Sequence, residues 1–168
     1  EVRNVHQRLF AVPPERLAPL LDSLSSRNDR LWPLEQWPRM RFDRPLGVGA
    51  SGGHGPIRYD VERYEPGRAV VFRFRAPRGF HGTHALFVED AEGGATLRHV
   101  LEMDTRGPAL VSWPLLFRPL HDALIEDALD KAELALLGRV EHPARWSWRV
   151  KLLRSLLRRR RPARAMPA

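Results

Sequence analysis

Three histidines, His84, His99 and His121, have the residue type and the placement that could support chemistry. His84 and His99 lie in segments that alternate between apolar and polar residues, and His121 lies one helical turn after Phe117. Imidazoles near neutral pH can supply a general acid and a general base, as an aldol-type cyclisation requires. Three imidazoles could also bind Zn²⁺ with an open fourth position. The remaining interpretation is that each one is a polar or hydrogen-bonded residue of a pocket wall.

We predict neither a metal nor a cofactor, because the sequence does not identify the acceptors that would fix metal ligands. His54 and His81 fall in predicted turns, where we expect them to be solvated. Glu126, Asp127 and Asp130 crowd one part of a predicted helix. A solvated face explains these acids better than a pair of catalytic carboxylates.

A glycine-rich segment over 47–55 contains the GxGxxG pattern at Gly47, Gly49 and Gly52. A dinucleotide site needs a strand before this pattern and a helix after it, because the helix N-terminus holds the pyrophosphate. The segment that follows, 57–62, alternates with a period of two and predicts a strand. We therefore reject the nucleotide site. The absence of cysteine excludes a thiolate metal centre and a cysteine nucleophile.

The net charge of +8 is located at one end of the chain. Residues 141–168 contain nine basic residues and one acidic residue, whereas residues 1–140 contain equal numbers of each. The main body therefore exerts no net attraction on a phosphate backbone, and we do not expect a nucleic-acid partner.

Periodicity predicts the elements that would position the histidines. A strand over 2–10 precedes a short helix with leucines at 17, 20, 21 and 24. Short turns then separate the strands of an antiparallel meander that begins at Ile57, and a turn at 91–94 would place His84 and His99 diagonally on one face. A long helix ends at Leu137, and Pro119 should kink it or mark a later start.

This order of elements resembles the superfamily that unites START lipid-binding domains, polyketide cyclases and the birch-pollen allergen (SRPBCC). Three segments are similar to family features: 11–17 (AVPPERL) to the passage from first strand to first helix, 64–68 (YEPGR) to a meander turn, and 52–56 (GGHGP) to the allergen's glycine loop. The resemblance covers about residues 2–138. It implies an α+β helix-grip fold, a curved antiparallel sheet of six or seven strands wrapped on a long C-terminal helix, with one or two short helices after the first strand. The seventh strand would come from 47–52.

The resemblance also implies a cavity between the sheet and the final helix, which the family uses for lipids, sterols or aromatic polyketides. Strand alternation and the helical stripe predict its lining. Trp32, Trp37 and Trp113 could lie at its mouth, or pack as a satellite of the core. The predicted ligand-binding residues are Tyr59, Phe72, Phe74, His84, Leu86, His99, Leu101, Trp113, Phe117, His121 and Leu124.

We divide the chain into a ligand-binding domain, 1–139, and a basic amphipathic tail, 140–168. In the tail, Trp146, Val150, Leu153 and Leu157 share one helical face, flanked by arginine and lysine. Such a helix fits an anionic membrane surface, here through Trp146–Arg161. The alternatives are docking on the domain or on a partner chain, or disorder.

These observations predict a protein that binds or transports a lipophilic small molecule, lipid or polyketide-like, in an internal apolar cavity. One alternative is a polyketide cyclase or dehydratase that uses His84, His99 or His121 as acid and base. A second is a lipid-handling protein docked on a membrane by its tail. The first residues lack the layout of a signal peptide, and we expect a cytoplasmic protein that can lie at the membrane periphery.

Overall fold

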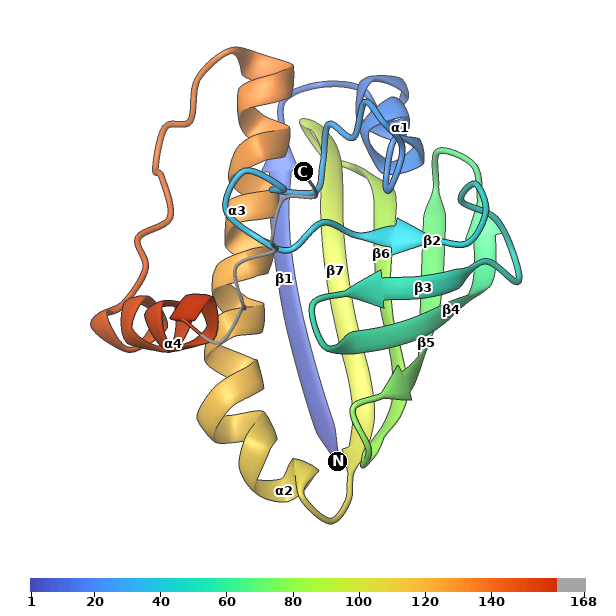
Figure 1. Cartoon of the computed structure of the whole chain (residues 1–168). Helices are drawn as coiled ribbons and strands as arrows, with labels where there is room; N and C mark the ends of the chain where they lie inside the picture. The colour runs from blue at the N-terminus through green and yellow to red at the C-terminus, as the bar shows by residue number, and fades with distance from the viewer. Residues whose placement is uncertain (160–168) are drawn as a thin grey trace, which may run out of the picture.

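Seven antiparallel strands, the longer ones with alternating apolar and polar residues, curve around a long helix (Figure 1). The computed structural model describes residues 1–159. The strands lie side by side in the order β1-β7-β6-β5-β4-β3-β2. Their bounds are β1 (Val2–Phe10), β2 (Arg41–Phe42), β3 (Ser51–His54), β4 (Ile57–Glu65), β5 (Ala69–Ala76), β6 (Phe80–Ala91) and β7 (Gly94–Thr105). The predicted α+β helix-grip class is confirmed.

The hairpin of β6 and β7 has the predicted register. His84 lies opposite Leu101, and Leu86 lies opposite His99. The two histidines are therefore diagonal neighbours on one face of the sheet, as expected. The edge strand β1 pairs with β7, which places His6 directly opposite His99.

The glycine-rich segment forms part of the sheet and not a phosphate loop. In β3, Gly52 and Gly53 pair with β4 on one side and with β2 on the other. A Cβ atom on Gly52 would lie 1.9 Å from the carbonyl oxygen of Arg41, and one on Gly53 would lie 2.0 Å from that of Ile57. Glycine is needed here because neighbouring backbone occupies the space of a side chain. The short strand β2 was not predicted from the sequence.

One short helix, α1 (Pro14–Asp22), follows β1 and buries its leucines against β6 and β7. The long helical run consists of α2 (Ala109–Ser112), a π-helical turn (Trp113–Phe117) and α3 (Arg118–Leu137). Pro119 lies in the first turn of α3, where its missing N–H is tolerated. The prediction that Pro119 marks a later start of the long helix is therefore confirmed. Gly138 ends α3 in the left-handed conformation. Among the described residues, no helix has the length and apolar character that crossing a bilayer demands.

Polar side chains on β1 attach the edge of the sheet to α3. His6 Nδ1 lies 2.7 Å from Glu126 Oε1, and Arg8 donates to Asp130 and Glu133, both at 2.7 Å. Two residues along a strand advance about 6.6 Å, close to the helical pitch of about 5.4 Å, so alternate residues of β1 meet successive turns of α3. This ladder closes one side of the fold.

The acids of α3 do not form the solvated face that the sequence predicted. Glu126 and Asp130 face β1, as described above. Asp127 accepts hydrogen bonds from the indole N–H groups of Trp37 at 2.7 Å and Trp146 at 2.8 Å. That interpretation was wrong because the partners of these acids come from segments far away in the chain.

The tail forms α4 (Trp148–Arg159), which packs against α3. Val150 is only 4% exposed, so the described part of the tail docks on the domain. Arg160 and Arg161 of the predicted membrane segment lie outside the described residues.

Candidate functional site

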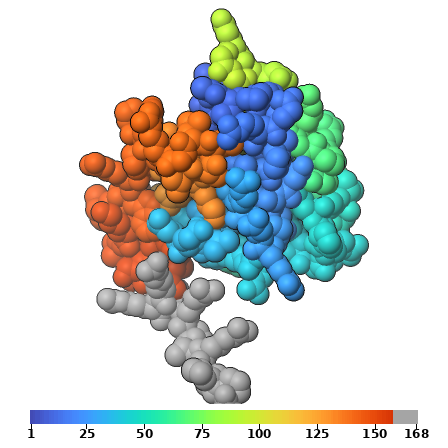
Figure 2. All heavy atoms as spheres, turned by 90° about the horizontal axis from the view of Figure 1, so that it is seen from above, coloured from blue at the N-terminus to red at the C-terminus, as the bar shows by residue number. Residues whose placement is uncertain are grey.

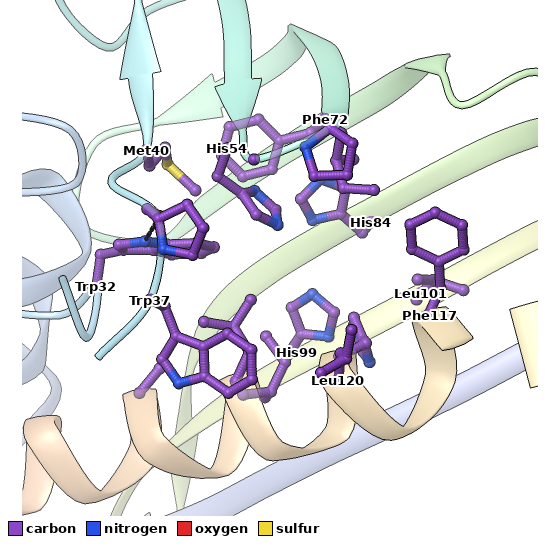
Figure 3. A pocket seen from close by; sticks show the side chains of 18 of the residues that line it. Trp32, Trp37, Met40, His54, Phe72, His84, His99, Leu101, Phe117 and Leu120 are labelled. Atoms are coloured by element: carbon purple, nitrogen blue, oxygen red, sulfur yellow. Dashed lines mark hydrogen bonds between the residues drawn. The ribbon is translucent and has the colours of Figure 1, made fainter. Parts of the chain in front are cut away.

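The concave face of the sheet, α3, the 24–40 connection and α4 surround a cavity of about 350 Å³ (Figure 3). This volume is within the range of small-molecule pockets, about 300–1,000 Å³. Its wall is almost entirely apolar, and imidazoles supply most of the exceptions. The long strands β6 and β7 supply one wall, and the buried stripe of α3 supplies the opposite one.

All of the predicted ligand-binding residues except Tyr59 line this cavity. Strand alternation placed the aromatic and histidine side chains of β5, β6 and β7 on the correct face, and the helical stripe did so for α3. Whether they bind a ligand or catalyse a reaction stays a prediction. The predicted residues that line the cavity are Phe72, Phe74, His84, Leu86, His99, Leu101, Trp113, Phe117, His121 and Leu124.

Tyr59 points to the same side of the sheet but is fully buried behind the wall. The ring of His84 lies edge-on to it at 4.7 Å between centroids, and Phe72 lies at 5.0 Å. Its hydroxyl lies 3.0 Å from Nδ1 of His54. Tyr59 therefore supports two side chains of the wall instead of forming the wall.

His84 is part of an aromatic stack. Its ring lies 4.8 Å from Phe72 and 4.9 Å from Phe74, with interplanar angles of 26° and 27°. These stacked rings form an aromatic surface of the cavity wall. Such a surface suits a planar or ring-containing ligand.

His84, His99 and His121 form a row from the sheet to α3. Their ring centroids are separated by 5.7 Å between His84 and His99 and by 4.9 Å between His99 and His121. Within the described residues, Nε2 of His84, Nδ1 of His99 and Nε2 of His121 are buried without a hydrogen-bond partner. Burial lowers the pKa of all three imidazoles below the ordinary value, well below it for His84 and His99. They are therefore neutral at pH 7, and each offers one donor and one acceptor.

His54 also lines the cavity, and its predicted solvation was wrong. Burial lowers its pKa to about 3, and its ring lies 4.7 Å from that of Trp32. Gly55 and Pro56 form a two-residue turn that places His54 opposite Ile57, on the face that Tyr59 shares. This turn was the signal that could have identified His54. Figure 3 shows the imidazoles of His54, His84 and His99 around one space.

Beside His121, three more polar side chains form a hydrogen-bonded group. Asp122 Oδ1 lies 3.3 Å from Nδ1 of His121 and 3.2 Å from Nε2 of His6, and it accepts a hydrogen bond from Asn4 at 3.0 Å. Although burial opposes ionisation, the hydrogen bonds from His121 and His6 hold the pKa of Asp122 well below its ordinary value. Because a carboxylate accepts, this contact fixes the tautomer of His121 with its proton on Nδ1.

Among residues 1–159, His6, His121 and Asp122 are the one group whose ligand atoms for a metal ion lie within 4.8 Å of one another. The nitrogens of His6 already face Asp122 and Glu126, so an ion would have to replace those hydrogen bonds. The three histidines that the sequence singled out, His84, His99 and His121, do not make such a group.

The 24–40 connection and α4 complete the cavity. Trp32 and Trp37 are buried in its wall, and Arg154 and Leu157 of α4 join them. The guanidinium of Arg154 lies 4.3 Å from a ring of Trp37 and 5.4 Å from one of Trp146, which is cation–π geometry. The sequence did not predict that the tail contributes to the cavity.

The comparisons with known proteins identify the fold. The sequence matches no family model and no curated protein. The structure is similar to that of CalU16 from Micromonospora echinospora, with a TM-score of 0.57 and 14% identity over 92% of this chain and 83% of that chain. It is also similar to XoxI from Bacillus cereus, with a TM-score of 0.61 and 14% identity over 84% of this chain and 99% of that chain. A protein from Thermobifida fusca gives a TM-score of 0.58 and 16% identity over 87% and 98%. At these identities the likeness shows a shared helix-grip-like fold, and membership in the superfamily stays a prediction.

Proposed function

We propose that the protein binds, and in this way carries, an uncharged lipophilic molecule in the cavity, either lipid or polyketide-like. The observation that carries the proposal is an apolar cavity whose wall contains three buried imidazole nitrogens with no partner among the described residues. An unsatisfied buried polar atom costs about 1–3 kcal/mol, so a ligand that supplies the partner recovers this free energy on binding.

The chemistry of the wall favours a particular kind of ligand. Neutral imidazoles donate to carbonyl oxygens and accept from hydroxyl groups, but they do not neutralise an anion. The ring stack of Phe72, Phe74 and His84 favours a flat hydrocarbon body. The best match is a ring-containing molecule with hydroxyl or carbonyl groups directed at the histidine row.

Native mass spectrometry of the purified protein tests this proposal, with Nile red as a neutral lipophilic probe in solution. We expect a co-purified small molecule and saturable dye fluorescence that Leu124→Trp abolishes by filling the cavity. Leu9→Trp, at an exposed position on β1, is the matched control and should bind the dye as the parent does. Equal dye binding by Leu124→Trp, or an empty cavity after expression in several hosts, would refute the proposal.

A second candidate function is catalysis of a polyketide cyclisation or dehydration with His121 as general base. The observation that favours it is the hydrogen bond of His121 Nδ1 to Asp122, which leaves Nε2 as the basic nitrogen of a residue that lines the cavity. His121→Ala should change the product profile of a poly-β-keto thioester substrate and keep the fold. His81→Ala, at an exposed position, should not change it. The same products from both variants would exclude this role.

A further inference from the structure

Helix α4 has two apolar faces, and only one of them packs on the domain. On the inner face, Val150 is buried and Leu157 lines the cavity. On the outer face, Trp148, Leu152 and Leu156 are 76%, 51% and 49% exposed. We call these three residues the outer stripe. They follow one another at intervals of four residues, so they form a row along one side of the helix.

The fold does not account for the outer stripe. The inner face already attaches α4 to the domain, and Figure 2 shows α4, in red, at the periphery of the molecule. Exposed apolar residues that form one row, in contrast to scattered ones, mark an interaction surface. Tryptophan in particular favours the interface between water and lipid, where its ring is apolar and its N–H is hydrated.

Positive charge surrounds the outer stripe. Arg149 and Lys151 are exposed beside it, and the entire net charge of +8 falls within residues 141–168. We propose that α4 binds an anionic membrane surface, with the outer stripe in the interfacial region and the basic side chains at the lipid phosphates. A helix that lies in the plane of the membrane buries its apolar face about 5–10 Å deep.

The charge distribution argues against the other occupants of the stripe. A second copy of the chain would bring two strongly positive segments together, which repel each other. The phosphates of a nucleic acid would pair with the basic side chains of α4, but they would leave its apolar row, which contains a tryptophan, exposed to water. An anionic bilayer satisfies both features at the same time.

Because α4 also forms part of the cavity wall, a membrane bound to α4 would lie close to the cavity. Besides the buried Val150, two polar contacts help to fix α4 to the domain: Arg149 donates to the carbonyl of Leu115 at 3.2 Å, and the guanidinium of Arg154 lies 4.3 Å from a ring of Trp37. Leu157 both lines the cavity and is 43% exposed, so α4 separates the cavity from solvent. A membrane on the outer stripe therefore lies next to this wall, where a lipophilic ligand can enter without crossing bulk water.

Vesicle flotation tests the proposal on the full chain and needs no knowledge of the ligand, so its outcome is independent of the proposed cavity function. We expect binding to phosphatidylcholine vesicles that contain phosphatidylserine, and none to pure phosphatidylcholine. Raising the salt from about 0.1 M to about 1 M should release the protein, because the Debye length falls from about 10 Å to about 3 Å. Lys151→Gln should weaken binding about fivefold.

One triple variant and one double variant distinguish a specific effect of the outer stripe from a general effect of exposed apolar side chains. Trp148→Ser/Leu152→Ser/Leu156→Ser should lose more than about tenfold in vesicle affinity with an unchanged thermal melt. Leu9→Ser/Val48→Ser removes exposed apolar side chains elsewhere and should bind as the parent does. Equal binding by the stripe variant would overturn the proposal. So would a parent dimer that the stripe variant converts to monomer, or binding to duplex DNA without binding to vesicles.

Discussion

At the scale of single residues, His6 and His99 both lie next to His121 and have opposite protonation preferences. Burial works against the charge of His6, but its hydrogen bonds to Asp122 and Glu126 outweigh burial and raise its pKa above the ordinary value of 6.5. Burial lowers the pKa of His99 well below that value, and the nearby imidazoles lower it further. The acids of α3 thus favour the protonated form of His6, whereas the burial of the cavity wall favours the neutral form of His99.

The raised pKa of His6 makes the β1–α3 ladder sensitive to pH. Its contribution to stability is complete below the unfolded value of 6.5 and is lost as the pH rises through the higher folded value. We expect His6→Gln to lower the free energy of unfolding by about 1 kcal/mol at about pH 5.5 and by much less at about pH 9. Urea unfolding of both proteins at the two pH values measures this difference. A penalty that grows with pH would contradict it.

We expect His99 to stabilise the ligand complex and to lower the free energy of unfolding of the ligand-free protein. It is 2% exposed and its Nδ1 has no partner among the described residues. We expect His99→Leu to raise the free energy of unfolding without ligand by about 1 kcal/mol and to weaken Nile red binding about fivefold. Chemical unfolding and dye titration measure the two effects, with the exposed His81→Leu as control. If His99→Leu destabilised the empty protein, a structural role for the imidazole would be the better explanation.

Residue-level prediction worked where the position depends on local periodicity alone. His84, His99 and His121 were placed in the cavity wall because alternation and helical spacing fix the direction of a side chain. His6 was missed because its role depends on the pairing of β1 with β7, which are distant in the sequence. His54 was missed because a two-residue turn was interpreted as part of a glycine loop.

At the scale of elements, Asp127 joins three segments that the sequence separates. Its carboxylate on α3 accepts from Trp37 in the 24–40 connection and from Trp146 just before α4. The two indole rings also lie edge-on, 5.4 Å apart. Sequence patterns predicted helix α3 and the amphipathic tail separately, but they could not predict this junction because no periodicity relates its members.

Removal of the Asp127 carboxylate should detach α4. Asp127→Leu leaves two indole N–H groups without an acceptor, and we expect it to lower the free energy of unfolding by about 2 kcal/mol. Because the junction holds the tail, limited proteolysis with trypsin should cleave within residues 138–147 faster than in the parent. Asp90→Leu, at an exposed position on β6, is the control. Proteolysis at the parent's rate would show that the other contacts are enough to hold α4.

At the scale of the whole molecule, a neutral body surrounds the cavity and a cationic appendage forms part of its outer wall. The sequence predicted the separation of charge correctly, because it follows from composition. It did not predict that the appendage reaches the cavity, because the contact of Leu157 with that space depends on how the chain returns after Gly138. In our two proposals, binding of a ligand and access to it therefore belong to different parts of the chain.

This division predicts how the molecule behaves without its tail. Truncation after Val140 removes Arg154 and Leu157 from the cavity wall, along with the whole excess of positive charge. The stacked rings and the histidine row stay in place, so we expect Nile red still to bind. Its release should become at least about tenfold faster, because affinity differences between related complexes arise mostly in the dissociation rate. Stopped-flow dilution measures that rate, and Trp148→Ser, which alters only the outer face, should release the dye as the parent does. An unchanged rate in the truncated chain would mean that the ligand leaves past the sheet or the 24–40 connection, and α4 would then have no part in access to the cavity.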